Sequence, residues 1–352
     1  MNCTVNSQRL AAELRLLNKI VPSKPAIAIL GHVLLKADGD ALGFYATDLE
    51  VGMSTSCPAS VHEPGRIALP VGKFLALVEQ FSDADVSISL GGQQVIVQCG
   101  GFRSRLLASP ADDFPEMPAP DGTTCLLDME ALRQLIACTR YAVASVGNKH
   151  VLRGALLTLS GSVAAMVGTD GKRLVLATKG RTGPDVTAIV PAKTLDVLAD
   201  QGVGDVKMTV GTRHLFFQMD GRLLVSRMID GEYPKYERII PRDNDKIVSV
   251  DRITLAAALR RVAVVEEAVF IDVASGSLEL TASSAEVGSA SEKIAVDYEG
   301  LPLKVCVNGS YVLDFLNAAL GQTITMALKD AKSAMLLTDG SDHICVVMLM
   351  RK

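Results

Sequence analysis

Residues 33–48 read VLLKADGDALGFYATD, and the same pattern returns as ALLTLSGSVAAMVGTD at 155–170 and as FIDVASGSLELTAS at 270–283. Each stretch contains an apolar run, a turn with a central glycine and a second run that ends near a threonine. Alternating apolar residues on both sides of such a turn predict an antiparallel hairpin. We therefore expect three copies of one structural unit, in which Thr47, Thr169 and Thr281 occupy equivalent positions.

Helical patterns flank every copy of this hairpin. Before each hairpin, apolar residues recur at intervals of three or four, as an amphipathic helix requires. They are Leu10, Leu14, Leu17 and Ile20 in the first copy, Leu132, Leu135 and Ile136 in the second, and Leu255, Leu259 and Val262 in the third. A second helix is expected within 69–81, 190–201 and 307–320, entered at Pro70, Pro191 and Asn308. A strand cluster then closes each copy, which gives a repeat of about 120 residues.

Two segments rich in Pro, Gly and Asp separate the copies, at 109–124 and 231–246. Such composition is typical of linkers between domains that have their own cores. The expected domains are therefore 1–118, 122–241 and 246–352. Because strands outnumber helices and most strands are joined by turns, the expected fold class is α+β with antiparallel sheets.

Composition narrows the class of protein. The 352-residue chain is 49% hydrophobic and 21% charged, so we expect it to fold throughout. No apolar run reaches the roughly 20 residues of a membrane span and no signal peptide is visible, so a cytoplasmic location is expected. Seven scattered cysteines without a CxxC pair favour reduced, packed thiols over metal ligands. The formal charge of -4 argues against nucleic-acid binding unless basic residues gather on one surface.

Motifs for catalysis are missing from the sequence. It contains no GxGxxG, GxxxxGKS/T, GxSxG or HExxH pattern, and its five histidines lie far apart. The segment 169–174, TDGKRL, is interpreted most simply as a turn with a solvated Lys-Arg pair. We therefore expect no catalytic residue, no cofactor and no metal site. An enzyme built from repeated α+β domains is kept as an alternative, which would need titratable groups gathered in a deep pocket.

Three segments resemble a known family. TDGKRL at 169–174, DGEYPKYERIIP at 230–241 and VVMLMRK at 346–352 are similar to TDGHRL, DGxFPDYxxxxP and VVMPMRL of the bacterial DNA polymerase III beta subunit, or DNA sliding clamp, family. The similarity extends along essentially the whole chain. It implies a processivity factor without catalysis of its own, in which two subunits of three clamp domains join head to tail as a dimeric ring. Antiparallel sheets would form the outside, and two helices per domain would line a hole around duplex DNA, whose sequence is not read.

The resemblance also implies two sets of surface residues. Those expected to approach DNA are Lys24, Lys73, Arg133, Lys149 and Lys193. The expected contact between the subunits of the homodimer places Arg103, Arg105 and Leu106 against Val264 and Val265. A basic inner surface with an acidic exterior would reconcile the net charge with DNA binding.

A further implied site is a pocket between the second and third domains that receives short linear motifs of partner proteins. The implied partners are the DNA polymerase III alpha subunit, the clamp-loader ATPase, and other polymerases and repair factors. The pocket residues would be Leu152, Thr169, Gly171, Lys172, Arg173, Leu174, Pro234, Arg238, Ile239, Asn308, Tyr311, Val346, Val347, Met348, Leu349, Met350 and Arg351. An apolar groove rimmed by arginine suits a peptide with hydrophobic anchors.

This sequence departs from the family pattern in and near that pocket. Lys172 stands where histidine is usual, Leu349 replaces a proline, and the segment after Val265 is several residues shorter. These changes leave the choice of partners open. They also keep a specialised or secondary clamp that mainly binds partner peptides as an alternative to the main replicative clamp.

Overall fold

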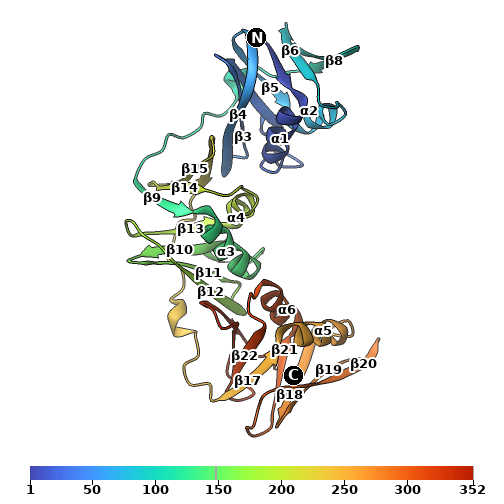
Figure 1. The fold of residues 1–352 in the computed structure, drawn as a ribbon, viewed down its shortest axis with the longest axis vertical. Coiled ribbons are helices and arrows are strands. Elements are labelled where there is room, and N and C mark those ends of the chain that lie inside the picture. The colour runs from blue at the N-terminus through green and yellow to red at the C-terminus, as the bar shows by residue number, and fades with distance from the viewer. Residues whose placement is uncertain (147–148, 352) are drawn as a thin grey trace. The chain divides into compact units, whose positions relative to one another are not determined.

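Three copies of one order of elements make up the chain in the computed structural model, which describes residues 1–146 and 149–351 (Figure 1). Each copy, called a repeat below, consists of a strand, a helix, four strands, a helix and three strands. All strand pairings within the sheets are antiparallel, as between β10 and β11 or β18 and β19. The predicted α+β class, with antiparallel sheets and two α-helices per repeat, is confirmed.

The bounds of the elements show how regular the repeat is. The first repeat contains β1 (Asn2–Asn6), α1 (Ser7–Asn18), β2 (His32–Asp38), β3 (Ala41–Thr47), β4 (Val51–Glu63), β5 (Gly65–Pro70), α2 (Val71–Val78), β6 (Asp85–Gly91), β7 (Gln94–Cys99) and β8 (Phe102–Leu107). The second contains β9 (Thr123–Asp128), α3 (Met129–Thr139), β10 (Gly154–Ser160), β11 (Val163–Thr169), β12 (Arg173–Gly180), β13 (Val186–Pro191), α4 (Ala192–Ala199), β14 (Asp205–Val210), β15 (His214–Met219) and β16 (Arg222–Arg227). The third contains β17 (Lys246–Asp251), α5 (Arg252–Val262), β18 (Ala268–Ala274), β19 (Ser277–Ser284), β20 (Gly288–Ala295), β21 (Leu303–Asn308), α6 (Gly309–Ala318), β22 (Thr323–Leu328), β23 (Met335–Thr338) and β24 (His343–Val347).

The helices begin where the sequence provides a cap, and they bury the predicted stripe. The side chains of Asn6, Asp251 and Asn308 accept hydrogen bonds from backbone N–H groups in the first turns of α1, α5 and α6. Pro70 stands at the start of α2, where its missing N–H leaves no bond unmade. The ten apolar residues predicted to face the core, from Leu10 to Val262, are all buried.

The predicted equivalence of three threonines is right for two of them. Thr47 ends β3 and Thr169 ends β11, but Thr281 lies inside β19, which continues to Ser284. Counted from the first residue of each strand, Ser283 is the counterpart of Thr47 and Thr169. Threonine is a β-branched residue that suits the interior of a strand as well as its end. A threonine in the sequence therefore does not by itself show where a strand ends.

Two strand pairings join successive repeats. In the first seam, β4 pairs with β16, with Val51 opposite Ser226. In the second seam, β12 pairs with β24, from Arg173 opposite Val347 to Ala177 opposite His343. In both seams the third strand after the first helix of one repeat pairs with the last strand of the next repeat. Two strands with these positions in their repeats are not in a seam. They are β20, the third strand after the first helix of the third repeat, and β8, the last strand of the first repeat, and each lies at the end of a sheet.

The chain divides into two compact units that do not coincide with the repeats. The first unit contains residues 1–129 and 200–228, and the second contains 130–199 and 229–352. The first holds a 12-stranded sheet that includes β9, β14, β15 and β16 of the second repeat. The second unit holds an 8-stranded sheet with the order β13-β10-β11-β12-β24-β23-β22-β17, and a 4-stranded sheet with the order β20-β19-β18-β21. The predicted domain boundaries stay predictions.

The core of the second unit extends across the second seam. Val175 of β12 and Cys345 and Val347 of β24 are fully buried in the same hydrophobic cluster as Phe315 of α6. The seam is therefore held by apolar burial as well as by ladder hydrogen bonds. No helix in the described part of the chain is long and apolar enough to cross a membrane.

Candidate functional site

A tight turn between β11 and β12 forms one wall of the candidate site. The Thr169 hydroxyl donates to the carbonyl of Arg173 and accepts from the N–H of Gly171. The Asp170 carboxylate accepts the N–H groups of Lys172 and Arg173. Gly171 has a φ of 87°, a conformation that glycine adopts without a steric penalty. The turn is therefore fixed by its own side chains.

The first repeat contains the same turn between β3 and β4. Thr47 and Asp48 make the four corresponding hydrogen bonds, to Val51, Leu49 and Glu50. The residue at the place of Gly171 is Leu49, which keeps a φ of 76° and is 53% exposed. A leucine in this conformation is strained by about 1–2 kcal/mol. The hydrogen bonds of the turn hold it there.

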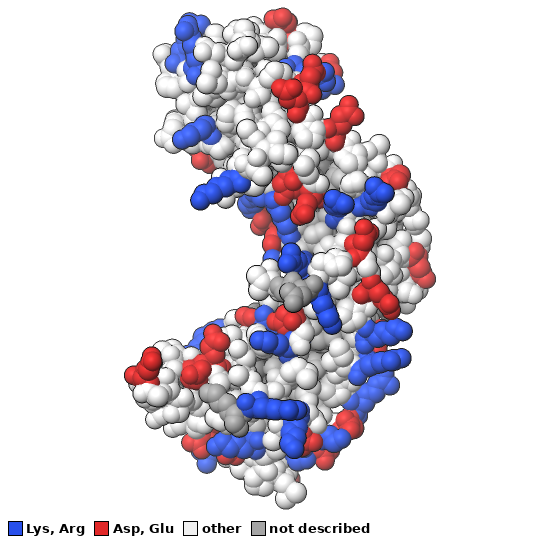
Figure 2. All heavy atoms as spheres, turned by 180° about the vertical axis from the view of Figure 1, so that it is seen from behind, with Lys and Arg blue, Asp and Glu red and all other residues white. Residues whose placement is uncertain are grey.

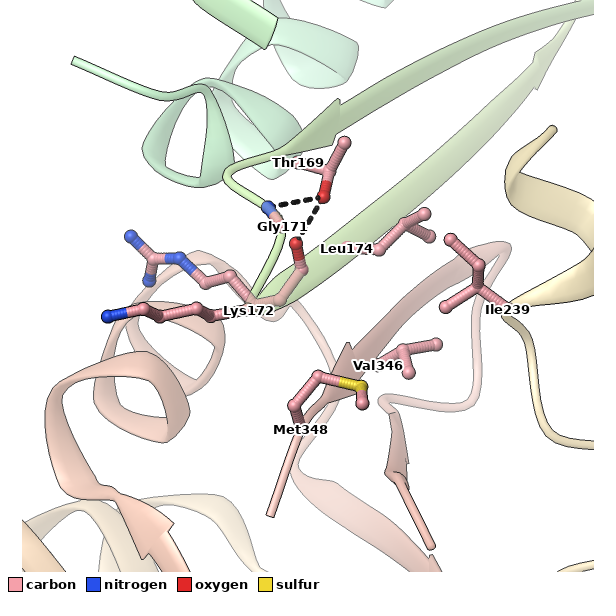
Figure 3. A pocket seen from close by; sticks show the side chains of 8 residues that line it. Thr169, Gly171, Lys172, Leu174, Ile239, Val346 and Met348 are labelled. Carbon is pink, nitrogen blue, oxygen red and sulfur yellow. Dashed lines mark hydrogen bonds between the residues drawn. The ribbon is translucent and has the colours of Figure 1, made fainter. Parts of the chain in front are cut away.

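A shallow apolar pocket lies beside the Thr169–Arg173 turn, within the second compact unit (Figure 3). Its cavity volume is about 40 Å³, so it is a surface depression that could seat one apolar side chain or part of one. It is lined by Thr169, Gly171, Lys172, Arg173, Leu174, Ile239, Val346 and Met348. All eight belong to the pocket set that the sequence predicted. Met348 is 47% exposed, and its flexible thioether can adapt to different ligands.

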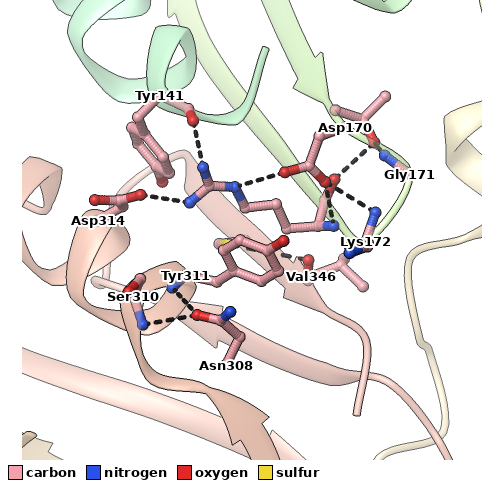
Figure 4. A network of polar contacts seen from close by, with 12 residues as sticks. Tyr141, Asp170, Gly171, Lys172, Asn308, Ser310, Tyr311, Asp314 and Val346 are labelled. Carbon is pink, nitrogen blue, oxygen red and sulfur yellow. Dashed lines mark hydrogen bonds and ion pairs between the residues drawn. The ribbon is translucent and has the colours of Figure 1, made fainter. Parts of the chain in front are cut away.

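Arg173 is the centre of a polar cluster next to this pocket (Figure 4). Its Nε donates to Asp170 Oδ2 at 3.1 Å, its Nη1 donates to Asp314 Oδ2 at 2.6 Å, and its Nη2 donates to the carbonyl of Tyr141. The guanidinium also lies over the rings of Tyr141 and Tyr311, at 5.4 and 4.5 Å from their centroids. Burial alone would lower the pKa of Arg173, but Asp314 and Asp170 outweigh it, so the pKa is raised. Arg173 is therefore always charged and is committed to partners in the protein.

The sequence missed two members of this cluster. Tyr141 and Asp314 lie far from Arg173 along the chain, in η3 (Arg140–Ala142) and in α6. Burial, followed by the nearby thiols of Cys345 and Cys138, raises the pKa of Tyr141 well above its ordinary value. No local motif marks either residue. In the sequence, an ionic partner for Arg173 is indicated by Asp170, which lies three residues before it within TDGKRL.

The other predicted pocket residues have different surroundings. Leu152 and Val347 are buried in hydrophobic clusters, and Leu349 packs against the core that contains Val347. Asn308 caps α6, and Tyr311 stacks on Arg173. The remaining residues belong to two segments beside the pocket: Pro234 and Arg238 lie before and at the end of η5 (Tyr236–Arg238), and Met350 and the exposed Arg351 follow β24. None of these nine residues lines the depression in this structure.

A second, larger cavity of about 290 Å³ lies at the other end of the second seam. Among its lining residues are Gln134 and Cys138 of α3, Lys179 of β12 and His343 of β24. His343 Nε2 lies 3.2 Å from the carbonyl of Cys138, and its Nδ1 lies 3.5 Å from the buried carboxylate of Asp339. Burial lowers the pKa of His343 and outweighs the opposing effect of Asp339. The neutral imidazole is therefore the stable form at neutral pH.

The residues predicted to approach DNA lie on separate elements of both compact units. Lys24 and Lys73 are exposed in the first unit, and Lys149 is exposed in the second. Arg133 of α3 is 3.6 Å from Glu130, and Lys193 is half-buried in α4. Figure 2 shows Lys and Arg interspersed with Asp and Glu on the face that it draws. A joint DNA-binding surface of these five residues stays a prediction.

The residues predicted at the subunit contact lie near open edges of sheets. Arg103, Arg105 and Leu106 are in β8, which ends the 12-stranded sheet. Val264 is 79% exposed just after α5, whereas Val265 packs partly against the core. The described residues include no group of three or more His, Cys, Asp or Glu side chains that could hold a metal ion.

Comparisons with known proteins agree along the whole chain. Models of the DNA polymerase III beta subunit match its N-terminal domain at residues 1–118, its central domain at 126–235 and its C-terminal domain at 237–352. The beta sliding clamp of Pseudomonas putida is 32% identical over 369 residues, which cover 100% of both chains. That of Caulobacter vibrioides is 33% identical over 371 residues, which cover 99% of both.

Solved structures give the same result. The DNA polymerase III subunit beta from Pseudomonas aeruginosa has a TM-score of 0.95 at 29% identity, with complete coverage of both chains. The DNA polymerase sliding clamp from Caulobacter crescentus has a TM-score of 0.93 at 31% identity, again with complete coverage.

Proposed function

The chain belongs to the DNA polymerase III beta subunit family and is a sliding clamp, a non-catalytic processivity subunit, and on that premise we propose that two copies close head to tail into a ring around duplex DNA. The observation that carries this proposal is the pair of open edges, β8 and β20. A strand at the end of a sheet has unpaired backbone N–H and C=O groups that can pair with another chain.

The two seams inside the chain indicate how the edges would pair. The first seam joins β4 to β16 and the second joins β12 to β24. By position in the repeat, β20 corresponds to β4 and β12, and β8 corresponds to β16 and β24. A third seam of the same kind would join β20 of one copy to β8 of its partner. Two such contacts, related by twofold symmetry, close the assembly and leave neither edge open.

The subunit contact would also bury side chains next to these edges. In β8, Phe102 is 44% exposed and Leu107 is 73% exposed, and Val264 is exposed after α5. Covering such apolar surface contributes about 25 cal/mol for each Å² removed from water. The residues that we assign to this contact are Arg103, Arg105 and Leu106 of β8, with Val264 and Val265.

We assign DNA contact to Lys24, Lys73, Arg133, Lys149 and Lys193. Their charges would attract phosphates without reading bases, and the ring itself would keep the protein on DNA. Because retention is topological in this arrangement, weak contacts are sufficient and permit sliding.

We assign partner binding to the depression beside the Thr169–Arg173 turn. Leu174, Val346 and Met348 provide an apolar floor for one anchor residue of a linear motif. The partners that we propose are the alpha subunit of DNA polymerase III, the clamp-loader ATPase, and other polymerases and repair factors. A cytoplasmic location is also proposed, because all seven cysteines are free thiols.

Retention on circular DNA tests the ring. The protein is loaded onto a nicked circular plasmid with its clamp loader, and bound protein is measured by gel filtration before and after the plasmid is linearised. We expect retention on the circle and loss from the linear form. Retention that is equal on both forms would refute topological binding.

A matched variant tests the edge. Arg105→Pro removes a backbone N–H on the open side of β8, because in this register Ser104 and Leu106 are the residues that bond to β7. The suitable control is Val163→Ala, at an exposed position away from β8 and β20. Light scattering should find a dimer for the control and a monomer for Arg105→Pro. A protein that is monomeric without any substitution, yet still binds partner peptides, would favour the alternative of a secondary clamp.

A further inference from the structure

Matching positions in the three repeats give the register that β20 and β8 of two copies would adopt. The residues that stand opposite Thr47, Thr169 and Ser283 in the three hairpins are Gly52, Leu174 and Ser289. In the two seams, Gly52 is paired with Val225 and Leu174 is paired with Val346. Ser289 should therefore be paired with the residue of β8 that corresponds to these two valines.

The backbone bonds after the last strand of each repeat identify that residue. In every repeat, one N–H group in this segment donates to a carbonyl of the strand that precedes the second helix. The donors are Ser109, Ile229 and Met350. The residues four positions earlier are Arg105, Val225 and Val346. Ser289 is therefore expected opposite Arg105, and Ser291 opposite Arg103, because antiparallel strands advance in opposite directions by equal steps.

The two arginines of β8 lie on the face of the strand that points away from the core. Leu106 stands opposite the fully buried Val95, so its side chain is on the core face. Successive side chains of a strand alternate between faces, which puts Arg103 and Arg105 on the other one. Both are exposed, and neither makes an ion pair with another residue that the structure describes.

The outer face of β20 offers no carboxylate to these arginines. Ser289, Ser291 and Lys293 alternate along it, and all three are exposed. The acidic residue of β20, Glu292, stands opposite a fully buried leucine of β19 and accepts a hydrogen bond from Arg261 at 2.8 Å. Because a shift of the register by two residues keeps the faces, it would bring no carboxylate to the arginines either.

We propose that the contact between two copies binds a tetrahedral oxyanion, such as inorganic phosphate, on this outer face. Arg103 and Arg105 of one copy and Lys293 of the other would supply the positive charge. The hydroxyls of Ser289 and Ser291 would donate hydrogen bonds to the oxygens of the ion. This inference rests on the proposed pairing of β8 with β20, and the site is incomplete in a single copy.

The spacing of the side chains and their charge both favour one shared ion. Residues two apart on a strand begin about 7 Å apart, so the guanidinium groups of Arg103 and Arg105 can reach the same anion. Closing the contact would bring these two cations beside Lys293, and an anion between them would offset the repulsion. The oxyanion should therefore strengthen the association of the two copies.

The test measures self-association of the full-length protein in inorganic phosphate and in sodium chloride at the same ionic strength. The dissociation constant of the dimer is obtained by sedimentation equilibrium. If no monomer is detected, the rate of exchange between fluorescently labelled copies is measured instead. We expect phosphate to lower the dissociation constant, or to slow the exchange, by roughly three- to tenfold, because exposed ion pairs are weak but the contact occurs twice in the ring. Arg103→Gln should remove most of this effect.

A substitution that supplies the missing carboxylate distinguishes an anion site from general screening by salt. Ser291→Asp would place a carboxylate opposite Arg103, so it should strengthen the dimer in chloride and make phosphate ineffective. The matched control is Thr187→Asp, which adds the same charge at an exposed position of β13, in another sheet. That variant should respond to phosphate as the unmodified protein does.

The possible results separate this inference from the proposed ring. Equal association in phosphate and chloride, or a phosphate effect that survives both Arg103→Gln and Ser291→Asp, would overturn the anion site and leave the ring intact. A protein that stays monomeric in both salts at every concentration would refute the ring itself, and the anion site with it. Strengthening by a short oligonucleotide but not by inorganic phosphate would assign the contact to a nucleic-acid backbone and would also overturn the inference.

Discussion

Substitution of Arg173 tests whether the polar cluster beside the pocket stabilises the second seam. Arg173→Ala removes three hydrogen bonds to the guanidinium and two contacts with aromatic rings. It also leaves the carboxylates of Asp170 and Asp314 without their cation. We therefore expect a loss of stability, together with a weaker partner site.

The magnitude follows from the exposure of the groups left behind. Removing one partner from a buried ion pair costs about 3–5 kcal/mol. The Arg173 side chain is 10% exposed, but that of Asp314 is 40% exposed and can be solvated again. Asp170 retains two backbone N–H donors. We therefore reduce the expected cost of Arg173→Ala to about 2–4 kcal/mol. Arg173→Lys, which keeps the charge but can satisfy only part of the forked geometry, should cost about half as much.

The free energy of unfolding is measured by urea denaturation, followed by circular dichroism. The surface control is Arg15→Ala, because Arg15 is 58% exposed and pairs with Glu79, which is 36% exposed. That control should change stability by less than about 1 kcal/mol. Equal stability of Arg173→Ala and Arg15→Ala, or an Arg173→Lys protein as stable as the unmodified one, would refute the structural role of the cluster.

Three further predictions concern pH, backbone strain and the core. Burial lowers the pKa of His343 in the folded protein below the unfolded value of about 6.5. The stability that the neutral imidazole contributes is therefore complete above about pH 6.5 and is lost as pH falls toward the folded pKa. His343→Gln removes this titration, so the melting temperature of the variant should decline less between about pH 7 and pH 5. Gly171→Ala should lower the free energy of unfolding, measured by urea denaturation, by about 1 kcal/mol, since φ is positive and no atom lies near the added methyl group. Leu49→Gly should leave this free energy unchanged or raise it by up to about 1 kcal/mol, because it relieves the strain of a positive φ. A loss in both variants would contradict the strain argument. Phe315→Ala, at a fully buried ring of α6, should cost about 3–5 kcal/mol, and a smaller loss would mean that the core of the second unit collapses into the space.

The repeat pattern could be predicted from the sequence because it depends on local periodicity. Leu10, Leu132 and Leu255 each begin an apolar stripe that folds as a helix wherever it occurs. Thr281 shows the limit of this reasoning, because a threonine fits many positions in a strand. Only pairing with the neighbouring strands β18 and β20 fixes where β19 ends.

The site could be predicted in part, and the physical reason differs from residue to residue. The eight residues that line the pocket belong to segments with strong family similarity. The role of Arg173 was not predictable, because Tyr141 and Asp314 approach it from elements distant in the sequence. Its placement in the pocket set led to the expectation of a ligand contact, whereas most of its hydrogen-bonding capacity is used within the protein.

The two seams have a consequence for how the chain can be taken apart. In the second repeat, β16 pairs with a strand of the first repeat and β12 pairs with a strand of the third. A fragment cut at the two linkers would contain the second repeat but would lose the strands of the first and third repeats that pair with it. Each lost pairing would leave an unpaired edge strand that is prone to aggregation. The repeat of the sequence is therefore not a unit that can be excised from this chain. Deletion or exchange of domains in this protein should follow the borders of its sheets, not those of its repeats.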